Sequence, residues 1–340
     1  MIKTAPVRML AFLLAGWAVP GAALAAEVKA KTVKLDGYAE WRQGEALVVD
    51  GQRVRFAANG ELKGKDEASS FASIPLGWEV KVEGLRLIDG TVLARKVETK
   101  PNGSALFEGE LKSAMDDMEQ QYRRQRRVYD EDENGRITDD YGALYEDGPM
   151  VDRVRAITNR LVPGYLHPEE FRVYVVDNKE WNAMAAPNGA IWVFSGLLED
   201  MDDDEVAIVL GHELAHATYE HSRKQFKKAM LIQLAALGVV VGAESIDSKW
   251  QRTAVQVATL LGVTAWQSGY GRRHEDQADR VGLRYAYEAG FDVSKGPRLW
   301  QRFAKKYGEP NKVVHFFLSD HSMAKVRAAN LERELELNYR

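Results

Sequence analysis

The sequence predicts an α+β protein in which a small all-β barrel precedes a mostly helical domain with a short edge sheet. Three observations predict this class. Between residues 28 and 100, short segments of alternating polarity lie between Asp-Gly and Asn-Gly pairs, which favour tight hairpins. From residue 149 onward, helical periods alternate with short strand-like runs. One helical stretch carries two histidines four residues apart, which places both on one face.

Composition narrows the class of function. The 340 residues carry a formal net charge of −4, which argues against a nucleic-acid partner because phosphate contacts need a basic face. A hydrophobic content of 45% is enough for a sizeable core. No cysteine is present, so disulfides, thiolate ligands and a lipid-modified cysteine are excluded. Any metal must therefore be held by His, Asp or Glu.

Residues 1–25 have the pattern of a cleavable secretory signal peptide. Lys3 and Arg8 precede the apolar run Met9–Val19, and Ala23 and Ala25 provide the small residues of a cleavage site. A membrane anchor is the alternative, but the run is too short to cross about 30 Å of hydrocarbon. We therefore expect a periplasmic protein with no transmembrane span in the mature chain.

Residues 26–105 are expected to form a small β-barrel domain of the OB or SH3-like kind. The predicted strands are Glu45–Val49, Gln52–Phe56, Trp78–Leu85 and Thr91–Val97, and the turn pairs are Asp50-Gly51, Asn59-Gly60 and Asp89-Gly90. This segment contains no cluster of catalytic residue types. We expect it to be a targeting or packing module.

Residues 106–148 predict a charged helix over Lys112–Tyr129 and then an acidic linker. The run from Asp130 to Ile137 is similar to the front half of an EF-hand calcium loop, with oxygen-bearing side chains before a turning glycine. Position 12, where such a loop has a bidentate Glu, is Tyr141. We therefore expect a solvated acidic turn without a tight calcium site.

Residues 149–340 predict a domain of helices and short strands. The expected helices are Met150–Leu161, Asp203–His221, Lys224–Gly242, Lys249–Gln267 and Arg273–Ala289, and the expected strands are Phe171–Val176, Trp181–Ala185 and Ala190–Ser195. Gly290 is placed to end the last of these helices in a left-handed conformation. Ala229–Ala243 is strongly apolar but short, so it is interpreted as a buried or lid helix.

The segment H-E-L-A-H, residues 212–216, carries the strongest chemical signal. Its two histidines, His212 and His216, lie on nearly the same face of a helix, so both imidazoles can reach one metal ion. Glu213 is rotated to one side, where it can take a proton from a metal-bound water. An accidental match is the alternative, but acidic Asp202–Glu205 suits the start of such a helix. His221 is expected to be an ordinary surface histidine.

A catalytic zinc commonly takes three protein ligands, so a third ligand should come from a separate element. Glu275 and Asp279 share one helix face with the small residues Ala278 and Gly282. Close packing at the small residues would bring Glu275 to the metal. Asp279 could accept the remaining N–H of a zinc-bound histidine. His274 is a possible ligand in a different direction and ranks below Glu275.

These residues resemble the HtpX-like zinc peptidases, which include the periplasmic BepA proteins, the mitochondrial Oma proteases and the CAAX prenyl proteases. The resemblance rests on H-E-x-x-H followed by E-x-x-A-D at residues 275–279, with Arg272 shortly before. Asn182–Leu198 is similar to the strand segment of the family. Ser319–Ser322 and Arg327 match its C-terminal element, except that Ser322 replaces a proline. The resemblance covers about Pro149–Leu335.

The resemblance implies a zincin-like, gluzincin-like metallopeptidase domain that holds one zinc ion per chain. It implies zinc ligation by His212, His216 and Glu275, with Glu213 as general base and Asp279 supporting a ligand. His321 would be a fourth ligand or would stabilise the tetrahedral oxyanion. The strand at Ala190–Ser195 would pair with an extended substrate backbone.

The function expected from this is a periplasmic zinc-dependent endopeptidase that cuts unfolded or misassembled envelope proteins. A rival hypothesis is an outer-membrane protein assembly factor or chaperone with a latent zinc site, in contact with the outer-membrane assembly machinery. A third is a metal-dependent amidase acting on cell-wall peptide, although the strand segment argues against it. Glu213 favours chemistry, because a structural zinc site has no need of a base there.

Overall fold

The computed structural model describes residues 32–64, 68–101, 108–131, 135–186, 188–221, 272–307 and 324–339. The expected signal peptide, the two helices expected between residues 224 and 267, and His321 lie outside these residues. Within the described part of the chain, no helix combines the length and the apolar character needed to cross a membrane.

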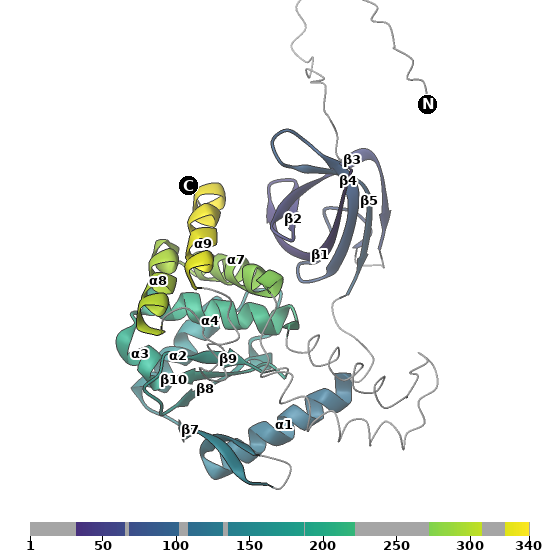
Figure 1. The fold of residues 1–340 in the computed structure, drawn as a ribbon. Coiled ribbons are helices and arrows are strands. Elements are labelled where there is room, and N and C mark those ends of the chain that lie inside the picture. The colour runs from purple at the N-terminus through teal and green to yellow at the C-terminus, as the bar shows by residue number, and fades with distance from the viewer. Residues whose placement is uncertain are drawn as a thin grey trace, which may run out of the picture.

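The expected small barrel is confirmed (Figure 1). Its strands are β1 (Thr32–Gln43), β2 (Ala46–Val49), β3 (Gln52–Lys63), β4 (Glu79–Arg86) and β5 (Val92–Lys100). They close in the order β1-β2-β3-β5-β4, with β3 and β5 parallel and the other pairs antiparallel. Their inward side chains form a separate apolar core that includes Leu47, Val54, Val80 and Val97.

One predicted hairpin turn of the barrel is wrong. Asn59 and Gly60 lie within β3, where the pairing with β5 shifts between Phe56 and Glu61. The strand therefore bulges at these residues and continues, because the barrel can absorb extra residues at a bulge without reversing the chain.

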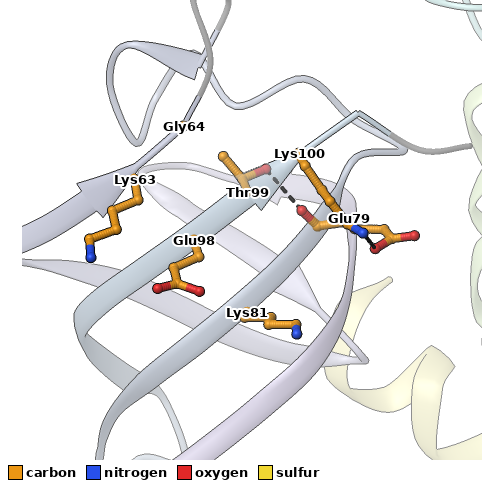
Figure 2. A pocket seen from close by; sticks show the side chains of 7 residues that line it. All are labelled: Lys63, Gly64, Glu79, Lys81, Glu98, Thr99 and Lys100. Carbon is orange, nitrogen blue, oxygen red and sulfur yellow. Dashed lines mark hydrogen bonds and ion pairs between the residues drawn. The ribbon is translucent and has the colours of Figure 1, made fainter. Parts of the chain in front are cut away.

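The outer surface of the barrel has a hollow beside β4 and β5 (Figure 2). Positively charged lysines and negatively charged glutamates line it, and Lys100 Nζ lies 3.0 Å from Glu79 Oε2. Since the lining carries charges of both signs, the hollow presents no single-signed surface to a charged ligand.

The stretch expected to be a helix and an acidic linker differs from the prediction. Helix α1 spans Glu108–Gln125 and ends where Arg126 takes a positive φ of 53°. Strands β6 (Arg127–Glu131) and β7 (Ile137–Tyr145) then form a hairpin. The prediction of an acidic linker is therefore wrong for this hairpin. Strand β7 pairs with a strand of the following domain, so the hairpin extends the sheet of that domain.

The second sheet has the order β6-β7-β8-β10-β9. Its remaining strands are β8 (Arg172–Val176), β9 (Ala183–Ala185) and β10 (Ala190–Phe194). Alternate residues of β10 face opposite layers, as the period of a strand requires. Ile191 and Val193 join the core beneath the helices, whereas Trp192 and Phe194 pack on the side of α1.

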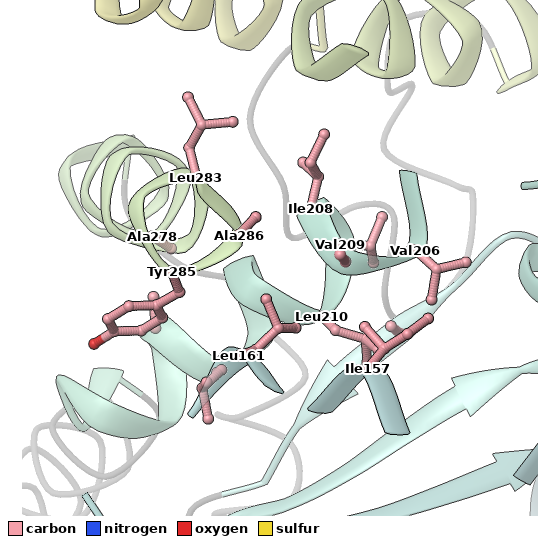
Figure 3. Close-up of a cluster of buried hydrophobic side chains, with 14 of the residues drawn as sticks. Ile157, Leu161, Val206, Ile208, Val209, Leu210, Ala278, Leu283, Tyr285 and Ala286 are labelled. Atoms are coloured by element: carbon pink, nitrogen blue, oxygen red, sulfur yellow. The ribbon is translucent and has the colours of Figure 1, made fainter. Parts of the chain in front are cut away.

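Helices α2 (Pro149–Leu161) and α4 (Asp203–Thr218) lie on the face of the sheet opposite α1 (Figure 1). Short α3 (Ser195–Asp200) follows β10, and α7 (Arg272–Glu288), α8 (Gly296–Tyr307) and α9 (Ala324–Asn338) form the layer above α4. Figure 3 shows side chains of α2, α4 and α7 meeting in one cluster, including Ile157, Leu161, Leu210, Leu283 and Tyr285. Gly290, with φ +78°, ends α7 as predicted.

The barrel shares part of its packing with the helical domain. Trp41 and Val48 belong to the large apolar core beneath α4 and α7, apart from the barrel's own core. The rings of Tyr38 and Tyr219 meet edge to face with centroids 5.1 Å apart. The face formed by β1 and β2 is therefore packed against the helices.

Candidate metal centre

Helix α4 fixes the first two candidate ligands. Its start is a complete capping box, in which the Asp202 side chain accepts from the backbone N–H of Glu205 and the Glu205 side chain accepts from that of Asp202. The helix then runs through a buried apolar stretch to His212 and His216. Both histidines are buried, with 2% and 0% of their surfaces exposed.

Two glycines, Gly211 of α4 and Gly282 of α7, let the two helices approach closely. Close packing at Gly282 was predicted from the sequence. A Cβ on Gly211 would lie 2.5 Å from the carbonyl oxygen of Gly282, and a Cβ on Gly282 would lie 2.4 Å from the backbone nitrogen of His212. Neither position has room for a side chain. This backbone contact brings Glu275, on the first turn of α7, beside the two histidines.

His212, His216 and Glu275 direct their donor atoms to one point. The Nε2 atoms of the two histidines are 3.0 Å apart, and Glu275 oxygens lie 3.5 Å from the Nε2 atom of His212 and 3.3 Å from that of His216. Ligands about 2.0–2.1 Å from a tetrahedral zinc lie about 3.3–3.4 Å from one another. The three residues, all buried, therefore fit a zinc ion in spacing and in chemical type.

Asp279 and Arg327 support the first of these histidines. Asp279 Oδ1 lies 2.9 Å from His212 Nδ1, on the side of the ring away from the candidate metal. Arg327, from α9, donates to both oxygens of Asp279 at 2.6 and 2.9 Å. The ring face of Trp300 covers the guanidinium of Arg327, whose Cζ atom lies 3.4 Å from the ring centroid. The paired arginine keeps Asp279 ionised in a buried place and thereby fixes His212.

The sequence profile described as peptidase family M48 matches residues 151–335, which is more than half of the chain. The chain belongs to peptidase family M48. A second profile, a domain of unknown function (DUF5666), matches residues 36–98, which lie within the barrel.

Individual relatives agree with this membership. The chain is 32% identical over 187 residues to the mitochondrial metalloendopeptidase OMA1 of Bos taurus, covering 52% of this chain and 34% of the relative. It is 29% identical over 145 residues to a beta-barrel assembly-enhancing protease of Vibrio cholerae, covering 42% and 30%. It is 29% identical over 164 residues to metalloprotease LoiP of Escherichia coli, covering 48% and 62%. The chain thus spans about a third of the first of these relatives.

The position of His221 in the M48 domain corrects the prediction of a surface histidine. Helix α4 ends at Thr218, and Glu220 takes a positive φ of 55°, which turns the chain back. His221 is consequently buried, with its Nδ1 atom 2.9 Å from His216 Nδ1 and its Nε2 atom 3.0 Å from Gln277 Oε1. The prediction assumed a continuous helix through residue 221, and no local signal marked its end.

The other sequence predictions for the site have mixed outcomes. His274 stacks on the ring of His221, with centroids 4.4 Å apart, and is not one of the three clustered donors. Glu213 is buried, with 3% of its surface exposed.

The predicted pairing of strand β10 with a substrate backbone is wrong, because β8 and β9 occupy its two edges. Strand β9, which contacts α4, is the outer strand at this end of the sheet.

Burial and charge set the protonation of the three histidines differently. Burial lowers the pKa of His216 well below its usual value and lowers that of His221 to about 3. Burial and Arg327 also act to lower the pKa of His212, but hydrogen bonds to Asp279 and Glu275 outweigh them and raise it to about 9. Metal binding would therefore release a proton from His212, because a ligand imidazole must be neutral.

Proposed function

We propose that this M48 protein is a zinc-dependent endopeptidase that binds one zinc ion through His212, His216 and Glu275. The observation that carries the proposal is the buried group of three donor atoms at the spacing of zinc ligands. Two imidazoles and one carboxylate leave one coordination position open, as catalytic zinc sites do.

The chain's own residues supply the proton transfers. Bound at this site, zinc is a Lewis acid that lowers the pKa of a water molecule to about 7. Glu213 would act as general base, taking a proton from the attacking water and giving it to the amine nitrogen of the broken peptide bond. Asp279 would accept the Nδ1–H of His212 and so keep the Nε2 lone pair of that ring free to hold the zinc ion.

The proposed substrate is a polypeptide in an extended conformation. Strand β9 is one of the two outer strands of the sheet and contacts α4, so a peptide bound on this side of the sheet would lie near the zinc ligands. Pairing through backbone groups gives binding with little side-chain specificity. This suits unfolded or misassembled envelope proteins, and the secretory pattern of residues 1–25 supports a periplasmic location.

His321 is proposed to control the open coordination position. A neutral imidazole can take that position and block the site, or it can stabilise the oxyanion of the tetrahedral intermediate. In the first case His321→Ala raises basal proteolysis, and in the second it lowers kcat at unchanged zinc content. Unchanged proteolysis of both peptide and protein substrates would contradict both roles.

A role in outer-membrane protein assembly is the second candidate. It is supported by the similarity to a relative named for beta-barrel assembly and by the barrel of strands β1 to β5, which is proposed to contact a partner. In this case the zinc site would be latent, and binding of unfolded envelope proteins would not depend on Glu213.

A protease assay separates the two candidates. Wild type and Glu213→Gln are incubated with unfolded envelope proteins, and cleavage, binding and zinc content are measured in parallel. We expect cleavage by wild type alone, with equal zinc in both proteins. Equal binding without cleavage by either protein would favour the assembly factor.

A further inference from the structure

A buried carboxylate of the barrel faces helix α7. The side chain of Glu40, on β1, has 0% of its surface exposed. Its Oε2 atom accepts from the backbone N–H of Gly51 at 3.0 Å. Its Oε1 atom accepts from Arg280 at 3.0 Å and from Gln277 Nε2 at 2.8 Å. Paired with Arg280, Glu40 is a charged acceptor that two residues of α7 contact from the helical domain.

The contact continues from Gln277 to a candidate zinc ligand. Gln277 Oε1 lies 3.0 Å from His221 Nε2, and His221 Nδ1 lies 2.9 Å from His216 Nδ1. All four side chains are buried, with between 0% and 4% of each residue exposed. We call this series, from Glu40 through Gln277 and His221 to His216, the Glu40–His216 chain.

The carboxylate of Glu40 sets the direction of every hydrogen bond in the Glu40–His216 chain. A carboxylate only accepts, so the Gln277 amide group must donate to Glu40 and turn its oxygen to His221. His221 must then carry its proton on Nε2 and accept at Nδ1. His216 must therefore carry its proton on Nδ1. Its Nε2 lone pair is left facing His212 and Glu275, where the donor atoms converge.

We infer that Glu40 of the barrel acts through Gln277 and His221 to hold His216 in the orientation and tautomer that bind the metal. The inference rests on the proposed zinc site. His212 has its own carboxylate, Asp279, in direct contact. His216 is supported in the same way by a carboxylate from the other domain, through two intervening side chains. Glu40, Gln277 and His221 are thus positioning residues, and the barrel is a component of the metal centre.

The first test is the zinc affinity of full-length variants, measured by competition with a chromogenic chelator. Gln277→Met removes the amide group and so interrupts the Glu40–His216 chain. The new side chain has a similar length, and Glu40 remains paired with Arg280. Because partners that orient metal ligands commonly contribute about 10- to 100-fold in affinity, we expect a loss of that size. Glu40→Gln, which removes the charge, should lose affinity in the same direction but less.

Asp50→Asn is the matched control. Asp50 is another carboxylate of the barrel that faces α7, 3.1 Å from Arg273, but it is not a member of the Glu40–His216 chain. A general loosening of the interface would weaken zinc binding in all three variants, whereas the inference expects affinity close to wild type in Asp50→Asn. Equal affinity in wild type and Gln277→Met would overturn the inference.

A second test needs no substitution. In ¹⁵N-histidine NMR of the wild-type protein, we expect the proton of His221 on Nε2 and that of His216 on Nδ1. The opposite tautomer of His221 would overturn the inference even if zinc binds. Failure of the proposed function has a different signature, since a protein that binds no zinc or cleaves no peptide can still show the expected tautomers.

Discussion

Gly282 of α7 lies so close to His212 of α4 that a Cβ at position 282 would be 2.4 Å from the His212 backbone nitrogen. The contact involves backbone on both helices, so no side-chain rotation can relieve a substitution. The position of Glu275 relative to the two histidines depends on this contact.

Gly282→Ala is therefore expected to separate the helices and to weaken both folding and metal binding. Overpacking of this kind commonly costs about 1–3 kcal/mol in the free energy of unfolding. Denaturant unfolding and zinc analysis measure the two effects. Ala286→Gly, one turn further along α7, is the control, since it changes helix propensity without adding an atom. Wild-type stability and zinc content in Gly282→Ala would contradict the close approach.

Purified Glu275→Ala is expected to contain much less than the one zinc ion per chain that is expected in wild type. The carboxylate lies within 3.5 Å of both histidine Nε2 atoms. Glu288→Ala removes an exposed carboxylate from the same helix and should retain the metal. Metal analysis after dialysis decides the matter. Full zinc content in Glu275→Ala would show that the third ligand lies elsewhere.

Glu119 of α1 is expected to make the stability of the fold depend on pH in the acidic range. Its carboxylate accepts from Arg172, Tyr174 and Asn188 at 2.5–2.8 Å. Burial acts to raise the pKa of Glu119, but the hydrogen bonds from Arg172 and Tyr174 outweigh it and hold the pKa below its usual value. A carboxylate with a lowered folded-state pKa stabilises the fold above its unfolded pKa, and that stability is lost as pH falls through the folded pKa.

The free energy of unfolding should thus fall below about pH 4.3 in wild type and less steeply in Glu119→Gln. At pH 7 the variant should lose about 1.5–3 kcal/mol, as expected for hydrogen bonds to a charged group. Urea unfolding at several pH values tests this. Parallel pH profiles for the two proteins would be the contrary result.

Residues 130–141 are expected to bind no calcium at micromolar concentration. Tyr141 stands where the bidentate Glu of an EF-hand would be, and Asp130 pairs with Asp139 across an antiparallel hairpin. Calorimetric titration of the full chain with calcium should show no micromolar site. A site that disappears in Asp130→Ala would be evidence of another ligand in this hairpin.

The sequence predicted what depends on local periodicity. His212 and His216 could be paired because one helix places residues four apart on one face, and Gly282 marked where a second helix could approach. The burial of His221 was missed because it depends on the positive φ of Glu220. The contact between Glu40 and Gln277 was missed because it joins residues 237 positions apart, and no sequence pattern records such docking.

The wide sequence separation of the supporting residues has a consequence for synthesis. Arg327 follows His212 by 115 residues, and its guanidinium completes the environment of Asp279. A nascent chain that already exposes the H-E-L-A-H segment therefore lacks the partner that holds it. The guanidinium that contacts both His212 and Asp279 is therefore added only when translation has passed residue 327 in α9.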